Sequence, residues 1–191
     1  MTVDAMLEAT PQVLLSEGIP RLTTTRVAER AGVSVGTMYQ YFPHKQALLY
    51  ALNEHYLDRV ALRVEAACRE HRGASTAAMV EALVAAYWEA KTERSDVTRA
   101  LYRSVVELDN ESLVEAFAQR LDTATLAMFA SASDAAGRDL TLANTTLLSA
   151  IFGTVRNVFE RNLPTPLQQD IRRQLVTMCL AYLEAVRARE D

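Results

Sequence analysis

The sequence predicts an all-α fold of about nine helices, with a three-helix head and a larger C-terminal helical body. The chain of 191 residues is half apolar and contains only 6 Gly and 5 Pro, a composition that favours helices over strands. Short turn signals separate segments of helical length, and no segment alternates convincingly between apolar and polar residues. We therefore expect no sheet.

The turn signals set the helix boundaries. The expected helices span residues 3–17, 24–31, 34–41, 44–71, 75–93, 96–107, 111–132, 139–162 and 166–188. Pro11 lies inside the first of them, where it removes one backbone hydrogen bond and clashes with the preceding turn. That helix either kinks or begins at Pro11 with Thr10 as its cap. We expect a head of residues 1–46 and a body of residues 47–191.

A tight turn joins the expected helices 24–31 and 34–41. Thr23 can cap the first helix through its hydroxyl group, and Ser34 can cap the second. Gly32, between them, can adopt the left-handed conformation that ends a helix. This layout is that of a helix-turn-helix, whose second helix lies in a DNA major groove.

The second of these helices has two different faces. Its inward face is expected to hold Val35, Met38 and Phe42, which lie within about 60° of one another, together with Val27 and Val33. On the opposite face, Gly36 allows close approach of DNA, while Thr37 and Gln40 can contact base edges. Phosphate oxygens suit the surrounding side chains, which are Thr25, Arg26, Tyr39, Tyr41, His44 and Lys45. The alternative is that this is only a helical hairpin of a bundle.

Charge is unevenly distributed along the chain. The formal net charge of −4 argues, taken globally, against nucleic acid as a partner. The segment from Arg21 to Lys45, however, holds four basic residues and one acidic residue, so it carries +3 and the rest of the chain −7. A basic head on an acidic body is a plausible footprint for docking on DNA through one face.

Residues 23–49, TTTRVAERAGVSVGTMYQYFPHKQALL, resemble the tetracycline-repressor (TetR) family of bacterial regulators. The resemblance implies a homodimeric, all-helical transcription factor, usually a repressor, in which an effector in the C-terminal domain moves the fourth helix and separates the two heads. Positions that match the family's DNA contacts are Thr25, Val35, Gly36, Thr37, Tyr39, Gln40, Tyr41 and Lys45. The chain departs from many relatives in having no Lys or Arg before Arg21 and in carrying Pro11.

The last two expected helices predict a dimer. Residues 166–188 are apolar over about 200°, more than one core contact requires, and the surplus would be exposed in a monomer. We expect these two helices to pair with their copies as a four-helix bundle about a two-fold axis. The candidate interface residues are Ala143, Thr146, Ala150, Gly153, Asn157, Val176, Leu180 and Leu183. The alternative is that the last helix is sandwiched within one chain.

A small-molecule effector would bind in the body. The residues that could line a pocket for an apolar or aromatic ligand are Tyr87, Trp88, Tyr102, Phe117, Phe129, Asn144, Phe152 and Arg156. The same aromatic side chains could equally be packed core. Asn144 falls within an apolar arc, where it needs a hydrogen-bond partner.

Other functional classes find little support. Cys68 and His71 form one possible pair of metal ligands with no second pair, so we expect no metal, and no cofactor-binding motif is evident. No nucleophile stands beside a base, so we expect no enzyme. Neither a signal peptide nor a membrane span is expected, which predicts a cytoplasmic protein, associated with the nucleoid when it binds DNA.

The sequence therefore predicts a DNA-binding transcriptional regulator, a repressor released from a palindromic operator by a small apolar or aromatic effector. The partners would be double-stranded DNA, a second copy of the chain and that effector. The alternatives are a DNA-binding regulator or scaffold with no effector, and a helical enzyme with a vestigial head.

Overall fold

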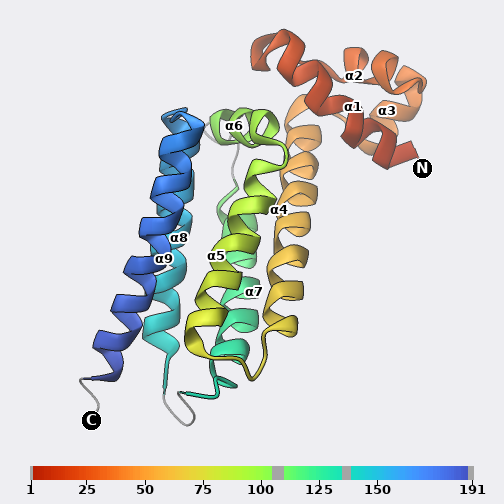
Figure 1. Cartoon of the computed structure of the whole chain (residues 1–191). Helices are drawn as coiled ribbons and strands as arrows, with labels where there is room; N and C mark the ends of the chain where they lie inside the picture. The colour runs from red at the N-terminus through yellow and green to blue at the C-terminus, as the bar shows by residue number, and fades with distance from the viewer. Residues whose placement is uncertain (1, 105–109, 135–138, 189–191) are drawn as a thin grey trace. The chain divides into compact units, whose positions relative to one another are not determined.

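The computed structural model describes residues 2–104, 110–134 and 139–188 (Figure 1). The described elements are α1 (Thr2–Glu17), the 3-10 helix η1 (Ile19–Arg21), α2 (Thr24–Ala31), α3 (Val35–Tyr41), α4 (Lys45–Glu70), α5 (Thr76–Thr92), α6 (Ser95–Ser104), α7 (Glu111–Phe129), α8 (Thr141–Glu160) and α9 (Thr165–Arg187). No strand occurs in these ranges. The predicted all-α fold is confirmed, although the expected end of one helix, at residue 107, lies outside the described residues.

The chain forms two compact units. The head unit comprises residues 1–58 and 94–114, and the body unit comprises residues 59–93 and 115–191. Helix α4 continues from one unit into the other without a break. The boundary expected after residue 46 falls in the first turn of this helix and stays a prediction.

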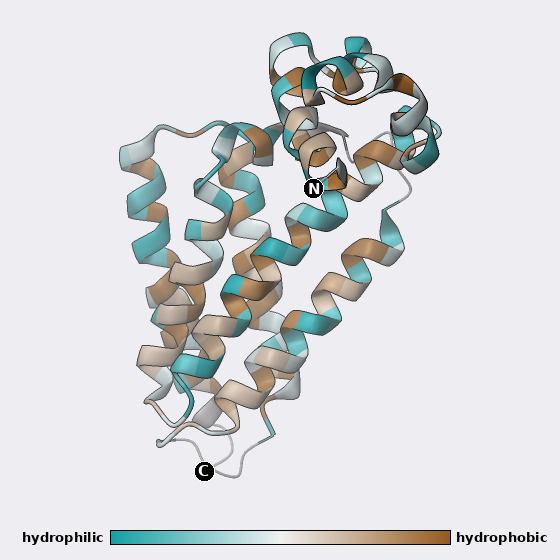
Figure 2. Cartoon of the chain, turned by 90° about the vertical axis from the view of Figure 1, so that its right-hand side faces the viewer, coloured by the Kyte–Doolittle hydropathy of each residue, from teal (hydrophilic) through white to brown (hydrophobic). Residues whose placement is uncertain are grey.

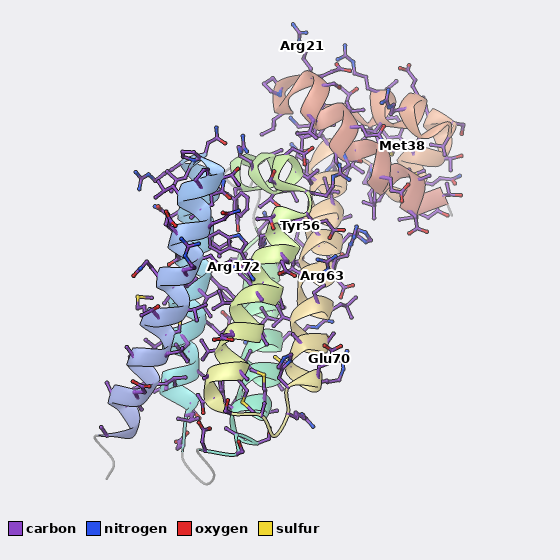
Figure 3. All side chains as sticks on the ribbon, in the orientation of Figure 1. Arg21, Met38, Tyr56, Arg63, Glu70 and Arg172 are labelled. Carbon is purple, nitrogen blue, oxygen red and sulfur yellow. The ribbon has the colours of Figure 1, made fainter. Side chains whose placement is uncertain are left out.

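The head unit is built on one apolar core. Met38 of α3 and Val27 of α2 are fully buried in it, together with Met6 of α1 (Figure 3). Within the same unit, the hydroxyl groups of Tyr56 on α4 and Thr98 on α6 hydrogen-bond to each other. The packing of Met38 in this core holds α3 on one side.

Helix α1 runs through Pro11 rather than starting there. It spans Thr2–Glu17, so the alternative in which it begins at Pro11 is wrong. The Thr10 hydroxyl donates a 2.6 Å hydrogen bond to the Met6 carbonyl oxygen, one turn earlier. Both Thr10 and Pro11 are buried, so the packing of this helix tolerates the missing proline N–H.

The body unit is a bundle in which α5, α7, α8 and α9 run side by side (Figures 1 and 2). Hydrophobic and hydrophilic residues alternate along these helices in Figure 2, as amphipathic packing requires. The last turns of α4 join the bundle through Glu65, which accepts a 2.9 Å hydrogen bond from Arg120 of α7. Arg63 of α4 pairs with Glu93 at 2.8 Å. None of the described helices is both long enough and apolar enough to cross a bilayer.

Candidate nucleic-acid interface and aromatic core

The turn between α2 and α3 has the caps that the sequence predicts. Thr23 accepts a 3.2 Å hydrogen bond from the Arg26 backbone N–H, and Ser34 accepts one of 3.0 Å from that of Thr37. Gly32 ends α2 in the left-handed conformation, with φ 68° and ψ 29°. Each cap satisfies backbone groups that a helix end leaves unpaired, so the turn is fixed by its own residues.

Helix α3 has one buried and one exposed side. Met38 and Phe42 face the core, whereas Tyr39 and Tyr41 are about half exposed at 49% and 51%. Val35 was expected to face inward, but it is 39% exposed, so that expectation is wrong. The core of the head contacts α3 at Met38 and at Phe42 just beyond its end, and the first turn therefore lies at the surface.

Gly36 stands in this exposed first turn. A Cβ atom added there would meet only the Ser34 Oγ within 4 Å, at an ordinary contact distance of 3.8 Å. Glycine weakens a helix relative to alanine. Nothing within the described chain therefore requires a glycine here, whereas close approach of another molecule would.

Several candidate phosphate-binding side chains already have partners. Arg26 pairs with Glu17, and Lys45 donates to the Ile19 carbonyl oxygen at 3.4 Å. His44 caps α4 by accepting from the Ala47 N–H at its Nδ1, at 3.1 Å. A neutral His44 that accepts at Nδ1 carries its proton on Nε2, which is then the donor that faces away from the cap.

The remaining candidates in the head differ in exposure. Gly36 and Gln40 are exposed, Thr25 and Thr37 are half-buried, and the Thr37 hydroxyl shares a 2.8 Å hydrogen bond with that of Ser34. Gln40 is thus exposed for direct contact with a base, whereas the Thr37 hydroxyl would first have to break its hydrogen bond with Ser34.

The body unit gathers three of the predicted pocket residues. The ring centroids of Tyr87 on α5 and Phe152 on α8 are 4.7 Å apart, and those of Phe117 on α7 and Phe152 are 5.8 Å apart. Trp88 and Phe129 are also buried in the body. Tyr102 belongs to the head unit instead.

The two polar pocket candidates lie in different surroundings. Asn144 is buried and donates a 2.8 Å hydrogen bond from its Nδ2 to Asp122 Oδ1, whereas its own Oδ1 is buried with no hydrogen-bond partner among the described residues. Arg156 is exposed on α8 and pairs with Glu160 at 2.7 Å, one turn later. This exposure and pairing do not support a pocket role for Arg156, which stays a prediction.

Lys91 is a feature of this core that the sequence reasoning missed. It lies one turn after Tyr87 on α5, is only 2% exposed, and has its Nζ 5.6 Å from the Tyr87 ring centroid and 5.9 Å from that of Phe117. Burial lowers the pKa of Lys91 from 10.5 to about 7. The sequence feature that could have revealed this buried residue is an isolated lysine near the end of an otherwise apolar helical face.

The predicted dimer residues divide by burial. Thr146, Gly153 and Asn157 are exposed on α8, and three more are half-buried, namely Ala150, Val176 and Leu180. Ala143 and Leu183 are buried at 4% and 2%, so they pack inside their own chain and do not offer a contact surface.

The candidate interface residues did not include three exposed apolar side chains on α8 and α9, namely Leu142, Leu167 and Met178. Leu142 is 78% exposed and lies one turn before Thr146, and Met178 of α9 is 49% exposed. The wheel of α8 could have shown that Leu142 continues the small-residue face. A Cβ atom at Gly153, on this same face, would meet nothing within 4 Å.

Two family models match the chain. Residues 6–52 match the model described as "Bacterial regulatory proteins, tetR family", and residues 75–183 match "Tetracyclin repressor-like, C-terminal domain". The chain belongs to the TetR family. The first match covers the helix-turn-helix described above, and the second covers the bundle with the aromatic core.

This TetR-family chain is also similar to curated proteins from other bacteria. The nucleoid occlusion factor SlmA of Haemophilus ducreyi is 34% identical over 109 residues, which are 56% of this chain and 53% of that protein. The SlmA of Actinobacillus pleuropneumoniae serotype 5b is 31% identical over 118 residues, 61% of this chain and 57% of that one. The chain thus spans about half the length of the curated relatives it matches.

Solved structures share the fold. A tetR-family transcriptional regulator from Streptomyces coelicolor superposes with a TM-score of 0.73 at 22% identity, over 99% of this chain and 85% of that one. The structure of a SmeT–triclosan complex gives a TM-score of 0.66 at 20% identity, over 94% and 90%.

Proposed function

We propose that this TetR-family protein is a DNA-binding transcriptional regulator, a repressor that a small effector releases from a palindromic operator. The observation that carries the proposal is the exposed side of α3. Gly36, Tyr39, Gln40 and Tyr41 are exposed there, while Met38 anchors the helix from behind. A rigid short helix with an open backbone and an amide donor suits a major groove.

The contacts divide into two kinds. Gln40 would read a base edge through its amide, and Thr37 would do so once its hydroxyl leaves Ser34. Tyr39, Tyr41 and the Nε2 of His44 would donate to phosphate oxygens and fix the register. Arg26 and Lys45 would join them by exchanging their present partners for phosphates, which supports strong salt dependence.

A second copy of the chain would double these contacts. Gly153 supports pairing through α8, because an exposed glycine inside a helix costs stability and no neighbour in the described chain requires it. The interface would also include Leu142, Thr146, Ala150 and Asn157 of α8 and Val176 and Leu180 of α9. A two-fold dimer would read inverted half-sites separated by whole helical turns.

Effector binding would act on DNA affinity through the continuous helix α4. A ligand that binds one state of the dimer better than the other shifts the population toward it. The complex of SmeT with triclosan, a protein of the same fold, supports a small aromatic ligand for this chain. Such a regulator would act in the cytoplasm, on the nucleoid.

Selection from a library of random duplexes tests the proposal. The wild-type protein should enrich inverted repeats, and its affinity for them should fall steeply between about 50 and 200 mM salt. Gln40→Ala should relax preference at one base position of each half-site, whereas Tyr41→Ala should weaken binding to all sequences. Arg173→Ala, an exposed change on α9, serves as the matched control. Enrichment of no motif, or affinity that ignores salt, would overturn the proposal.

A second candidate is a DNA-binding factor that works without a small effector. The curated relatives named nucleoid occlusion factor favour it. Close ring packing of Tyr87 on Phe152 also fits a body that is simply filled. Operator affinity that no small molecule alters would support this candidate over the first.

A further inference from the structure

A second pocket of the body unit lies at its surface, between the end of α4 and the middle of α7. Its volume is about 490 Å³, within the range of small-molecule sites. Its charged lining residues are three arginines and one glutamate, namely Arg69, Arg72, Arg120 and Glu65. The pocket thus holds an excess of two positive charges, and it is lined by other residues than the aromatic core.

The three arginines differ in their partners. Arg120 of α7 donates to both carboxylate oxygens of Glu65, at 2.5 Å from its Nε and at 2.9 Å from its Nη2. Arg69 lies four residues after Glu65 on α4, where an ion pair can form, but the carboxylate receives Arg120 instead. Within the described ranges, neither Arg69 nor Arg72 forms an ion pair or a side-chain hydrogen bond.

The two remaining arginines converge on one point of the pocket. Residues 65, 68, 69 and 72 follow helical spacing, so they share one face at the end of α4. Cys68 is buried beneath this face, with 3% of its surface exposed. Burial is the main cause that raises the pKa of the Cys68 thiol to about 11, Glu65 raises it further, and Arg69 and Arg72 both act to lower it. Both guanidinium charges therefore act on the same floor of the pocket.

The groups that could hold a ligand are the guanidinium groups themselves. The hydroxyl of Thr123, which also lines the pocket, already donates to the Gln119 carbonyl oxygen at 2.9 Å. A guanidinium group presents a planar fork of donors that matches the oxygens of phosphate and carboxylate groups. Cys68 and Ala124 add less polar surface beside it, so the pocket offers more than a place for a bare ion.

We propose that this pocket binds a small phosphomonoester, whose phosphate group pairs with Arg69 and Arg72 and whose organic part lies over Cys68 and Ala124. A phosphomonoester carries about −1.5 to −2 at pH 7, which balances the excess charge of the lining, whereas one carboxylate would balance only half of it. The site lies apart from the DNA-binding surface of α3 and does not depend on the proposed function.

Helix stability offers a competing explanation for one of these arginines. Basic side chains in the last turn of a helix interact favourably with its macrodipole, and Arg69 lies in the last turn of α4. That interaction does not explain why Arg120 of another helix meets the same hollow, or why Arg72 lies there too. A purely structural role predicts that loss of these arginines changes stability and leaves ligand binding as it was.

Calorimetric titration of the full-length protein tests the proposal, in a phosphate-free buffer at low salt. AMP, cyclic AMP and adenosine share one base and ribose and carry about two, one and no negative charges, and phenyl phosphate with phenol provides a smaller pair. The double variant Arg69→Gln with Arg72→Gln removes the proposed contacts. Its matched control, Arg161→Gln with Arg173→Gln, removes two exposed charges elsewhere on the body.

We expect the wild type to bind at least one monoester about tenfold or more tightly than its neutral counterpart, with cyclic AMP weaker than AMP if AMP is the ligand that binds. The Arg69 and Arg72 double variant should reduce that preference to about twofold or less, and the control should keep it. Circular dichroism and urea unfolding check that both variants fold. The comparison of monoester with neutral compound needs no variant, so it stands even if a variant does not fold.

Three results would overturn the inference. They are a wild type without preference for either monoester, a preference that survives in the folded Arg69 and Arg72 double variant, and an equal loss in the control, which would mean a general effect of charge. A wild type that lacks the preference while the double variant loses affinity for duplex DNA would assign these arginines to backbone phosphates instead. Monoester binding is measured without DNA, so either outcome leaves the test of the regulator proposal unaffected.

Discussion

Replacing Lys91 with methionine should stabilise the unliganded protein at neutral pH. The side chain is fully buried beside Tyr87 and Phe117, and methionine can occupy comparable volume without a charge. Removing a desolvated charge in favour of an apolar side chain is commonly neutral or stabilising. An increase in stability from a substitution deep in the core is unusual, which makes the prediction discriminating.

The magnitude follows from the titration of this group. Burial lowers the pKa of Lys91 from 10.5 to about 7, a shift of about 3.5 units. At about 1.4 kcal/mol per unit, burial of the charge lowers the free energy of unfolding by at most about 5 kcal/mol at pH 7 and below. Because repacking is imperfect, Lys91→Met should raise the free energy of unfolding by about 3 kcal/mol.

The pH dependence has a definite sign. Between pH 7 and 10.5 the unfolded chain binds more protons at Lys91 than the folded chain, so this contribution to stability grows as pH rises. The wild type should therefore gain about 1.5 kcal/mol between pH 7 and 8.5, and Lys91→Met should not. Below pH 7 the residue is protonated in both states, and its penalty is constant.

Urea unfolding at pH 6.5, 7.5 and 8.5 measures both effects, at one fixed protein concentration because assembly adds to apparent stability. The pH range stops at 8.5 because burial raises the pKa of Cys68 and of Cys179 from 9.0 to about 11, which destabilises the fold at higher pH. A variant no more stable than the wild type, together with a flat pH profile of the wild type, would refute the reasoning.

Four other changes test the head and the proposed dimer. Gly36→Ala should raise the free energy of unfolding by up to about 1 kcal/mol, since its Cβ has room, yet lower operator affinity about tenfold; unchanged affinity in a mobility-shift assay would place Gly36 outside the interface. Gly153→Ala should stabilise α8 of the single chain but weaken dimerisation in sedimentation, and an equally tight dimer would argue for another interface. Thr23→Ala should lower the free energy of unfolding by about 1 kcal/mol in urea, because it removes the cap of α2; no loss would show the cap to be dispensable. Glu17→Gln should free Arg26 and raise operator affinity at low salt, as measured by fluorescence anisotropy, and a fall would mean that the pair positions Arg26 instead.

Much of the fold could be predicted because its signals are local. Gly32 has a left-handed conformation that only a few residues adopt easily, and Thr23 and Ser34 have hydroxyl groups where helix ends need acceptors. Such requirements are met within four or five residues of the chain. The helix boundaries follow from them without knowledge of the tertiary structure.

Placement of single side chains could be predicted less well, because it depends on which helix lies opposite. Val35 occupies an apolar position of the α3 wheel, but the core does not extend to that turn. Arg156 interrupts α8 in a way that suggested a ligand contact, and the structure turns it to Glu160 and solvent. Lys91 escaped notice because long lysines usually extend to water, and only the packing of α5, α7 and α8 shows that this one does not.

Two glycines of this chain weaken its helices without any benefit inside the described structure. Gly36 and Gly153 each lack a methyl group for which there is space. A bundle selected only for stability would not be expected to keep both. They lie on the exposed turn of α3 and on the exposed face of α8, which are the places where a regulator of this kind would meet DNA and its second copy. Their shared cost is best explained by contacts made with other molecules, and each substitution named above separates that cost from the contact.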